Sequence, residues 1–356
     1  MDEVGGLGGV WGLRHHGDVD AEPGLVDFAV NVRPGGPPGW LRERLVGALG
    51  RVGAYPSAGD DLGAREVVAG RFGRGVDEVV VLNGSAEGFA LLPNLRPRKA
   101  ALVHPSFTEP EVALRQAGVP VEHVLLDAAD GYALHPGRVP EDADLVVVGN
   151  PTNPTSTLHP REVVLALVRP GRTVVVDEAF MDAVPGEPES VAAVSGVGVP
   201  GLMVFRSLTK TWAIPGLRAG YALSDPGTLA RLTWNRPQWP VGTLVLEAVR
   251  ACEEPRAVAE ARAGAVRLDE HRVELQKALA EIPGVRVEGD PRAPFLLLRV
   301  DDGAGLRAHL RGVGIAVRRG DTFPGLGPDH LRVAVRPPGE FGVLVEAVRD
   351  YQEGLS

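Results

Sequence analysis

The sequence predicts an α/β protein with a large, mostly parallel, doubly wound sheet and a smaller α+β C-terminal domain. Between about residues 60 and 225, short apolar strands alternate with helical stretches, which is typical of βαβ units. Several of these strands are apolar on both faces, as expected where helices cover both sides of a sheet. After Trp239 and Pro240 the pattern changes to long helices and then shorter strands. The length of 356 residues suits two domains at the usual scale of roughly 100–200 residues each.

The elements follow in chain order. Residues 1–30 predict an N-terminal arm with little structure of its own, residues 31–238 the large domain and residues 239–356 the small domain. The strands expected in the large domain are 79–83, 100–104, 121–126, 144–150, 173–180, 202–207 and 217–223. Residues 243–282 are rich in Ala, Arg, Glu and Leu and are interrupted at Pro255, so they predict long helices. The strands expected in the small domain are 285–289, 295–300, 314–319 and 330–335.

Composition and charge exclude several classes of protein. The formal net charge of −9 argues against a nucleic-acid partner, which favours a basic face. No apolar run reaches the roughly 18 residues that a membrane span needs, and the N-terminus lacks a secretory pattern. We therefore expect a cytoplasmic protein that does not bind a membrane. The single cysteine, Cys252, excludes an internal disulfide and a multi-cysteine zinc site.

Lysine is rare in this chain and therefore informative. Only three of the 37 Lys and Arg residues are lysines. One of them, Lys210, follows a predicted strand in the motif Ser207-Leu208-Thr209-Lys210, and Arg218 lies eight residues further on. A lysine at this edge of the sheet could form a Schiff base with an aldehyde cofactor, and Ser207 and Arg218 could hold its phosphate. A solvated surface lysine is the alternative for this motif alone.

Three other motifs lie at predicted strand ends. A carboxylate at Asp177 could pair with a protonated pyridine nitrogen, and the amide of Asn153, in a proline-rich turn, could bind a ring hydroxyl. The small residues of Asn83-Gly84-Ser85-Ala86-Glu87 run into a predicted helix and would expose backbone N–H groups to a phosphate. Each motif is common by itself, but their order and spacing together indicate one cofactor site.

With these motifs, the chain resembles the fold-type I enzymes that depend on pyridoxal 5′-phosphate, in the class I/II aminotransferase superfamily. The resemblance runs from about Asp27 to the C-terminus. It is strongest to the branch of cobalamin-pathway threonine-phosphate decarboxylases and histidinol-phosphate aminotransferases. The supporting motifs are His-Gly-Asp at 16–18, Asp-Phe-Ala-Val-Asn-Val-Arg-Pro at 27–34, and Asp-Glu-Ala-Phe at 177–180. The last resembles the decarboxylase form of a motif that usually ends in tyrosine in the aminotransferases.

The resemblance implies a role for each matching residue. Lys210 would bind the cofactor covalently and move the proton, Asp177 would hold the pyridine nitrogen, and Phe107 would stack on the ring. Tyr55 matches a tyrosine that reaches the cofactor phosphate of the neighbouring subunit, which implies a homodimer with composite active sites. The remaining cofactor contacts would come from residues that bind the ring hydroxyl or the phosphate: Asn153, Ser85, Ala86, Ser207 and Arg218.

The resemblance also implies a set of substrate-binding residues. Arg332 matches an arginine that binds a substrate carboxylate through its planar fork. Arg318 matches a second arginine that helps to bind a substrate phosphate, with Arg319 beside it as the alternative. His16 and Asn31 would complete the phosphate pocket. Two positions depart from the family pattern. Phe180 replaces a tyrosine whose hydroxyl would donate to the ring hydroxyl oxygen, and Arg33 replaces an asparagine and could alter the substrate pocket.

These motifs favour decarboxylation of O-phosphothreonine over transamination, and an amino-acid or histidinol-phosphate aminotransferase is the alternative. The bond that stands perpendicular to the cofactor ring decides between the two reactions, so the arginines that place the substrate would select the chemistry. A pseudoenzyme that only binds the cofactor is disfavoured by the intact Lys210, Asp177 and Arg218. An NAD-dependent oxidoreductase is disfavoured because no GxGxxG motif opens the first βα unit.

Other features are expected to be structural. The spacing of His104, His123, His135 and His159 matches no metal-ligand motif, so no metal site is predicted. The tryptophans near the site in the sequence are expected to pack in the core: Trp212, Trp234 and Trp239. The acidic pairs Glu253-Glu254 and Asp301-Asp302 are expected to lie on the solvated surface.

Overall fold

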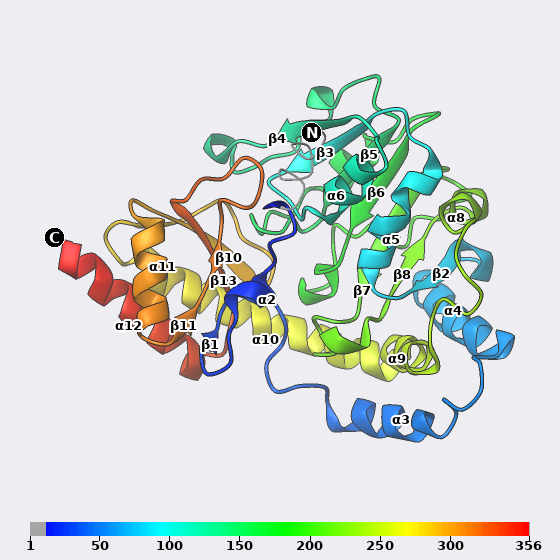
Figure 1. The fold of residues 1–356 in the computed structure, drawn as a ribbon, viewed down its shortest axis with the longest axis horizontal. Coiled ribbons are helices and arrows are strands. Elements are labelled where there is room, and N and C mark those ends of the chain that lie inside the picture. Colours follow the sequence, from blue (N-terminus) through cyan, green and yellow to red (C-terminus); the bar gives the residue numbers. More distant parts are fainter. Residues whose placement is uncertain (1–11, 356) are drawn as a thin grey trace, which may run out of the picture.

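The protein, described here by a computed structural model for residues 12–355, has one seven-stranded and one four-stranded sheet. The large sheet lies at one end of the molecule and the small sheet at the other (Figure 1). The strands of the large sheet are β2 (Val79–Leu82), β3 (Ala100–His104), β4 (Val121–Leu125), β5 (Leu145–Gly149), β6 (Thr173–Asp177), β7 (Leu202–Ser207) and β8 (Gly220–Leu223). All seven strands of the predicted large domain are therefore present; β3 and β7 have the predicted bounds, and the other five are shorter than the sequence indicated.

The large sheet has the strand order β2-β8-β7-β6-β5-β3-β4. Strand β8 runs antiparallel to both of its neighbours, and the other neighbouring pairs are parallel. The carboxyl ends of β5, β6 and β7 therefore meet at one edge of the sheet, where ligands bind in such folds. The register sets Gly149 opposite Asp177 and Asp177 opposite Phe205 at this edge.

Helices cover both faces of the large sheet, as the two-sided apolar strands predict. Side chains of alternate strand residues enter two separate clusters, because successive residues of a strand point to opposite faces. One cluster packs against α4 (Ala58–Phe72) and α9 (Thr243–Glu253), and the other against α5 (Ser85–Leu91), α6 (Glu109–Gln116) and α8 (Pro226–Leu232). The helices α3 (Gly39–Leu49) and α7 (Arg161–Leu165) complete this part.

Local signals in the sequence fix several helix ends. A capping box begins α4, in which Ser57 and Asp60 each bond the backbone of the other, and Gly73 with a positive φ ends the helix. Asp225 caps α8 and Asp302 caps α11 (Gly303–Gly312) through side-chain oxygens that accept backbone N–H groups. Pro255 stands at the first position of α10 (Pro255–Ala280), where a helix tolerates proline.

The small sheet is antiparallel throughout, in the order β12-β13-β10-β9. Its strands are β9 (Val285–Val287), β10 (Phe295–Val300), β12 (Arg318–Arg319) and β13 (His330–Ala334). They share a separate core with α11, α12 (Pro338–Leu355) and the second half of α10. Figure 1 shows α10 as the long helix that runs from the large part to the small part. The boundary at residues 238 and 239 stays a prediction.

The N-terminal arm is more ordered than the sequence indicated, in the residues that the structure describes. It contains the short helix α2 (Gly17–Asp20) and the strand β1 (Val26–Asp27), which pairs in parallel with β11 (Ile315–Ala316) of the small part. Phe28 and Ala29 are fully buried. The arm therefore packs on the small part of the molecule. The chain then continues through residues 31–49 to the large part. Residues 1–11 lie outside the described residues.

Candidate active site

Four of the predicted cofactor-site residues lie on loops that leave the large sheet at one edge. Asp177 ends β6, Ser207 ends β7, and Lys210 and Asn153 follow within a few residues of β7 and β5. Parallel neighbours in this sheet end side by side, so the topology brings together residues that are more than fifty positions apart. The strand-end motifs of the sequence thus share one place in the fold.

Lys210 is the amine at this edge. Its Nζ donates a hydrogen bond to Thr209 Oγ1 at 2.7 Å and lies 5.9 Å from the centre of the Phe180 ring. Desolvation by the surrounding protein, with the positive charge of Arg218, lowers the pKa of Lys210 to about 8. More of this amine is neutral at pH 7–8 than for an ordinary lysine, which suits a nucleophile and a proton carrier.

Asp177 is the carboxylate beside the lysine. Its Oδ1 accepts the backbone N–H of Ala179 at 3.1 Å. Desolvation raises the pKa of Asp177 to about 6, against the opposing effects of this hydrogen bond and of Lys210. A buried carboxylate that is costly to keep ionised is stabilised by a positively charged partner, such as a protonated ring nitrogen.

A narrow cradle lies at the start of α5. Gly84 has a φ of 78°, and a Cβ at this position would stand 2.7 Å from Arg218 Nη2. A Cβ at Gly220 would stand 2.8 Å from the backbone N of Ser85. Both glycines therefore let the guanidinium and the backbone amides of Ser85 and Ala86 approach one another. Among the described residues, the Arg218 guanidinium makes one hydrogen bond, to the Pro215 carbonyl at 3.1 Å, and no salt bridge.

The predicted phosphate ligand Ser207 is buried on the same side of the sheet. Its hydroxyl lies 2.9 Å from Thr209 Oγ1, the atom that accepts from Lys210. The two hydroxyls thus form a short polar chain that leads from the lysine to the end of β7. These two hydroxyls link the Lys210 amine to the side of the site where Gly84 and Arg218 form the cradle.

Phe107, the predicted stacking residue, is half-buried on the loop after β3. The ring of His16 lies 5.2 Å from the Phe107 ring with an angle of 31° between the planes. His16 Nε2 also lies 2.6 Å from Glu109 Oε1, in a pair that is partly buried. The arm therefore brings His16 to the Phe107 loop, and its role in a phosphate pocket stays a prediction.

Arg332 is buried between the arm and the large sheet. Its Nη1 donates to Asn153 Oδ1 at 2.6 Å, and its Nη2 donates to the Ala29 carbonyl. Arg332 Nε has no partner among the described residues. Desolvation and the charge of Arg318 lower the pKa of Arg332 to about 9, which leaves the guanidinium charged at neutral pH. One predicted cofactor ligand and one predicted substrate ligand are therefore in direct contact.

Arg318 and Arg319 point to different places. Arg318 pairs with Arg332 across β12 and β13, and only 2% of it is exposed. Its guanidinium is held by Asp20 at 3.4 Å and by Thr322 Oγ1 at 2.7 Å. Arg319 forms a more exposed ion pair with Asp321. Of the two arginines, Arg318 is the one beside Arg332, and it is already occupied by the arm.

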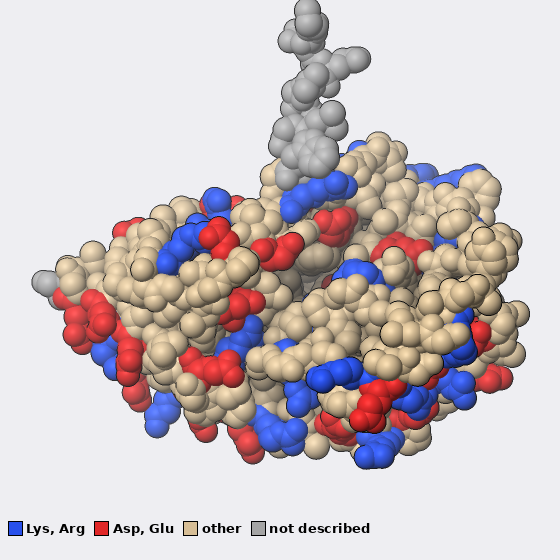
Figure 2. Space-filling view, turned by 60° about the horizontal axis from the view of Figure 1, so that its bottom comes forward, with Lys and Arg blue, Asp and Glu red and all other residues tan. Residues whose placement is uncertain are grey.

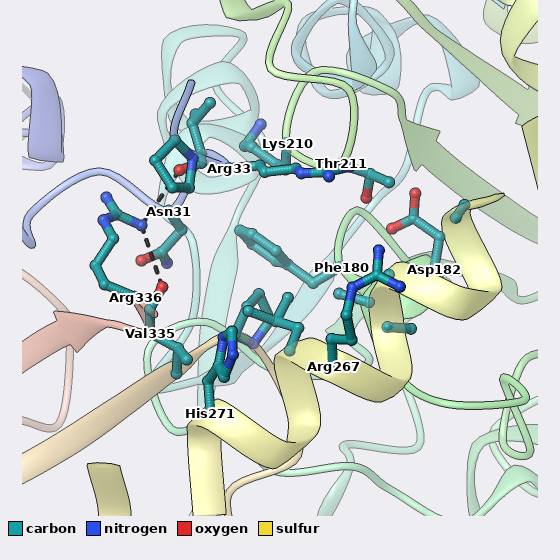
Figure 3. A pocket seen from close by; sticks show the side chains of 18 of the residues that line it. Asn31, Arg33, Phe180, Asp182, Lys210, Thr211, Arg267, His271, Val335 and Arg336 are labelled. Atoms are coloured by element: carbon teal, nitrogen blue, oxygen red, sulfur yellow. Dashed lines mark hydrogen bonds between the residues drawn. The ribbon is translucent and has the colours of Figure 1, made fainter. Parts of the chain in front are cut away.

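A cavity of about 290 Å³ borders Lys210 (Figure 3). It lies between the Lys210 loop and α10, whose Arg267 and His271 face it from the far side. Asn31 also borders this cavity. It is 8% exposed, and neither its Oδ1 nor its Nδ2 has a partner among the described residues. The unpaired amide suits a polar ligand, because a buried amide without a hydrogen bond is costly.

Phe180 forms part of the wall of this cavity. It is 7% exposed and packs edge-on against Phe295, with ring centres 4.9 Å apart. A tyrosine at this position would place a hydroxyl near Lys210, whereas phenylalanine makes this wall apolar.

Tyr55 lies apart from the other predicted residues. Its side chain is 74% exposed and stacks on the exposed Trp239, with ring centres 4.2 Å apart and planes 21° apart. An exposed aromatic pair of this kind suits contact with another molecule. Within one chain Tyr55 makes no contact that identifies a cofactor role, so that role stays a prediction.

Three expectations for residues near the site require correction. Trp212 is buried as predicted, but Trp234 and Trp239 are 65% and 52% exposed, because they lie on the surface segment before α9. Glu253 is 2% exposed, since Arg71 and the Tyr221 hydroxyl hold its two oxygens at 2.6 and 3.0 Å.

His104 and His123 also depart from the expectation of scattered histidines. Adjacent strands bring them within contact of one another and of Glu111. The sequence carried no signal for this cluster or for the Glu253 network, since each depends on which strands are neighbours.

Acidic and basic side chains are intermingled on the face shown in Figure 2, and neither kind forms a large continuous patch there. No helix of residues 12–355 is both long and apolar enough to cross a membrane.

Comparison with known proteins gives a consistent result. The family model described as aminotransferase class I and II matches residues 23–348. A histidinol-phosphate aminotransferase of Mycobacterium bovis is 54% identical over 338 residues, which cover 95% of this chain and 90% of the relative. The threonine-phosphate decarboxylase of Salmonella typhimurium is 30% identical over 342 residues, with 93% and 92% covered.

Among solved structures, the histidinol-phosphate aminotransferase of Clostridium acetobutylicum has a similar fold. Its TM-score is 0.84 at 24% identity, and the match covers 93% of this chain and all of that one. The likeness supports the predicted α/β fold of this superfamily.

Proposed function

The chain belongs to the class I and II aminotransferase family, and from this premise we propose that it is an aminotransferase acting on a phosphorylated amine such as histidinol phosphate. The observation that carries this choice is the 54% identity to a histidinol-phosphate aminotransferase over almost the whole chain. The threonine-phosphate decarboxylase relative is only 30% identical over a similar length. The preference for decarboxylation that the motifs suggested is therefore reversed.

Enzymes of this family use pyridoxal 5′-phosphate, which when bound supplies an aldehyde carbon for amines and a ring that withdraws electrons. The residues of this chain fit that group. The cradle of Gly84 and Arg218 has a glycine and a guanidinium that forms no salt bridge among the described residues, which suits a phosphate. Asp177 is a carboxylate with a raised pKa, and it suits a protonated ring nitrogen.

In this proposal Lys210 carries the proton. A lysine with a pKa of about 8 takes up and releases protons near neutral pH more readily than an ordinary one. Thr209 holds the amine at the strand end, and the apolar ring of Phe180 limits water on one side. The Lys210 amine would take the proton from the substrate carbon and later return it, and water would then release the keto product.

Arg332 and Arg318 give the site a positive wall. An aminotransferase binds its two substrates one after the other in the same site. Here one substrate would carry a phosphate monoester, and the other would be a keto acid that carries carboxylates. A guanidinium binds either kind of anion through two parallel hydrogen bonds. The hydrogen bond from Arg332 Nη1 to Asn153 Oδ1 holds this guanidinium beside the residue predicted to bind the ring hydroxyl. In this proposal His16, which lies beside Phe107 and pairs with Glu109, completes the pocket for the substrate phosphate.

Threonine-phosphate decarboxylation is the second candidate, and two observations favour it. The Salmonella relative shares 30% identity over 93% of this chain, and Phe180 and the His16-Gly17-Asp18 segment resemble the decarboxylase motifs. Both candidates use the same lysine and arginines, so the placement of the substrate alone separates them.

We further propose that the enzyme is a homodimer in which Tyr55 serves the neighbouring subunit. The 74% exposure of Tyr55 and its stacking on Trp239 support an aromatic surface that a second subunit would cover.

A product assay tests the proposal. The cofactor-loaded protein is mixed with histidinol phosphate and 2-oxoglutarate, and separately with O-phosphothreonine without a keto acid. Glutamate formed in the first mixture, with no CO2 in the second, supports the aminotransferase. CO2 with aminopropanol phosphate in the second mixture and no glutamate in the first would reject it in favour of the decarboxylase. The Lys210→Ala variant is the control for both mixtures.

A further inference from the structure

Two histidines and a glutamate meet on the outer edge of the large sheet, away from Lys210. His104 ends β3, His123 lies in β4, and Glu111 lies in α6, which Figure 1 shows beside these strands. The strands are parallel neighbours, and His123 stands opposite Leu102. His104 is two residues further along and therefore points to the same face as Leu102 and His123. The helix α6 covers this face and places Glu111 over both histidines.

The ligating atoms of the three side chains converge. His123 Nε2 lies 2.8 Å from Glu111 Oε1, and His104 Nε2 lies 3.3 Å from Glu111 Oε2. The two imidazole rings are 4.5 Å apart at an angle of 63°. One ligand atom from each residue lies within 4.8 Å of the others. A single ion with bonds of about 2.0–2.2 Å would bridge such a triangle after small side-chain rotations.

The burial of the cluster leaves two polar atoms unpaired. His104 is fully buried and Glu111 is 2% exposed. Neither His104 Nε2 nor Glu111 Oε2 has a hydrogen-bond partner among the described residues, although they face one another. The two atoms lie 3.3 Å apart without the geometry of a hydrogen bond. A buried polar atom without a hydrogen bond is costly, so an ion between them would satisfy both.

The surroundings of the cluster resemble those of a metal site. The other ring nitrogen of His104, Nδ1, lies 3.2 Å from Ser106 Oγ. Histidines that bind metals usually donate their second ring N–H to an oxygen, which turns the free nitrogen toward the ion. His123 is 29% exposed, so an ion has a path from solvent to the buried pair.

We propose that His104, Glu111 and His123 bind a divalent transition-metal ion, with Zn²⁺ as the best match. Two imidazoles and one carboxylate are a common zinc ligand set, and three protein ligands leave the fourth position for water. Mg²⁺ and Ca²⁺ are poor matches because they prefer oxygen ligands. The site is independent of the proposed reaction, since it contains no residue assigned to the cofactor or the substrate.

One neighbour opposes the ion. Arg115 Nε donates to Glu111 Oε1 at 2.7 Å, and the Arg115 side chain is 39% exposed. A guanidinium beside a divalent cation is repelled, and an exposed one is free to turn toward water. Arg115 therefore lowers the affinity for the ion without blocking the site.

Occupation of the site would affect the loop that carries Phe107. His104 begins this loop, and Glu111 follows it at the start of α6. An ion that links the two ends would hold the loop, including Glu109, which contacts His16. The site thus fits a structural role for one wall of the active site.

Equilibrium dialysis of the cofactor-loaded protein against Zn²⁺, after treatment with a chelator, tests the proposal. We expect about one Zn²⁺ per chain, which excess Mg²⁺ does not displace, and at least a tenfold weaker affinity in His123→Ala. His123 is partly exposed, so its removal leaves the core intact. The matched control is His135→Ala, because His135 forms a similar pair with Asp130 at 2.9 Å outside this cluster.

A second variant tests the position of the ion. Arg115→Gln removes the opposing charge, and we expect it to bind Zn²⁺ several times more tightly. No bound Zn²⁺ in the wild-type protein, or equal affinity in the wild type and His123→Ala, would overturn the proposal. Unchanged affinity in Arg115→Gln would overturn the placement of the ion on Glu111.

Discussion

The residues expected to hold the cofactor lie on loops at one edge of a single sheet, whereas those expected to hold the substrate come from three distant segments. We call the first group (Asn153, Asp177, Lys210 and Arg218) the cofactor half and the second (His16, Asn31, Arg318 and Arg332) the substrate half. The sheet alone positions the cofactor half. The substrate half requires the arm to pack on the small sheet, through β1, Asp20 and Ala29. Chemistry and substrate placement thus depend on different parts of the fold.

The largest effect is expected in the cofactor half. Replacing Lys210 with alanine removes the amine that carries the proton, so kcat should fall by at least about a thousandfold. The control is Lys277→Ala, which removes an exposed lysine of α10 and should leave kcat unchanged. Steady-state rates with the better substrate of the product assay measure both. A Lys210→Ala enzyme with more than a tenth of wild-type activity would contradict the assigned role.

The substrate half should respond mainly in substrate affinity. Arg332→Lys keeps a positive charge but loses the planar fork, so kcat/KM should fall by about a hundredfold, mostly through KM. Binding of the cofactor should change little, which separates the two halves. Arg299→Lys on the adjacent strand β10 is the control, because Arg299 makes an exposed ion pair with Asp329. Equal losses in cofactor and substrate binding would show that the halves are not separable.

The attachment of the arm should appear in stability as well as in activity. Asp20 is 2% exposed and holds Arg318 and Arg307. Asp20→Asn leaves the buried Arg318 without a counter-charge and should lower the free energy of unfolding by about 2–3 kcal/mol. Substrate KM should rise with it, because Arg318 and His15 lose their common partner.

Asp61→Asn is the matched control for this variant. Asp61 forms a partly exposed pair with Arg65 on α4, whose loss should cost less than about 0.5 kcal/mol. Urea unfolding curves of the three proteins measure the difference. A destabilisation by Asp20→Asn no larger than that of the control would mean that the arm is not held by this cluster.

The smallest effect concerns the pH dependence of Lys210. Only the neutral amine reacts with an aldehyde, and the pKa of Lys210 is lowered to about 8. The rate at which the cofactor-free protein reacts with pyridoxal should therefore rise about tenfold per pH unit below that value and level off above it. Lys210→Ala supplies the background from the other two lysines. A rate that still rises steeply between pH 9 and 10 would indicate an ordinary lysine.

The same contrast explains what the sequence could predict. Most strands of both sheets and the break at Pro255 follow from apolar patterns and proline chemistry, which are local. The strand predicted at 314–319 is instead two short strands, β11 and β12, in different sheets. The cofactor half follows as well, since Asn153, Asp177 and Lys210 lie at or just after the ends of recognisable strands and Arg218 lies just before one. The contact of Arg332 with Asn153, across 179 positions of sequence, has no local signal.

Features that arise only from strand order escaped the sequence. His104 and His123 looked scattered because their spacing matches no motif, yet adjacent strands bring them together. Glu253 looked like a surface residue because it forms an acidic pair with Glu254, but α9 carries it against Arg71 and Tyr221. The order of the arm was likewise underestimated, since β1 gains its hydrogen bonds from β11, about 290 residues away.

The central claim is that Lys210 is the amine that binds the cofactor, and chemical trapping tests it most directly. The protein loaded with pyridoxal 5′-phosphate is reduced with borohydride, digested and examined by mass spectrometry. The chain offers only three candidate lysines, Lys99, Lys210 and Lys277, so the assignment is unambiguous. We predict one added cofactor per chain, on the peptide that contains Lys210. A label on Lys99 or Lys277, or no stable label, would contradict the account.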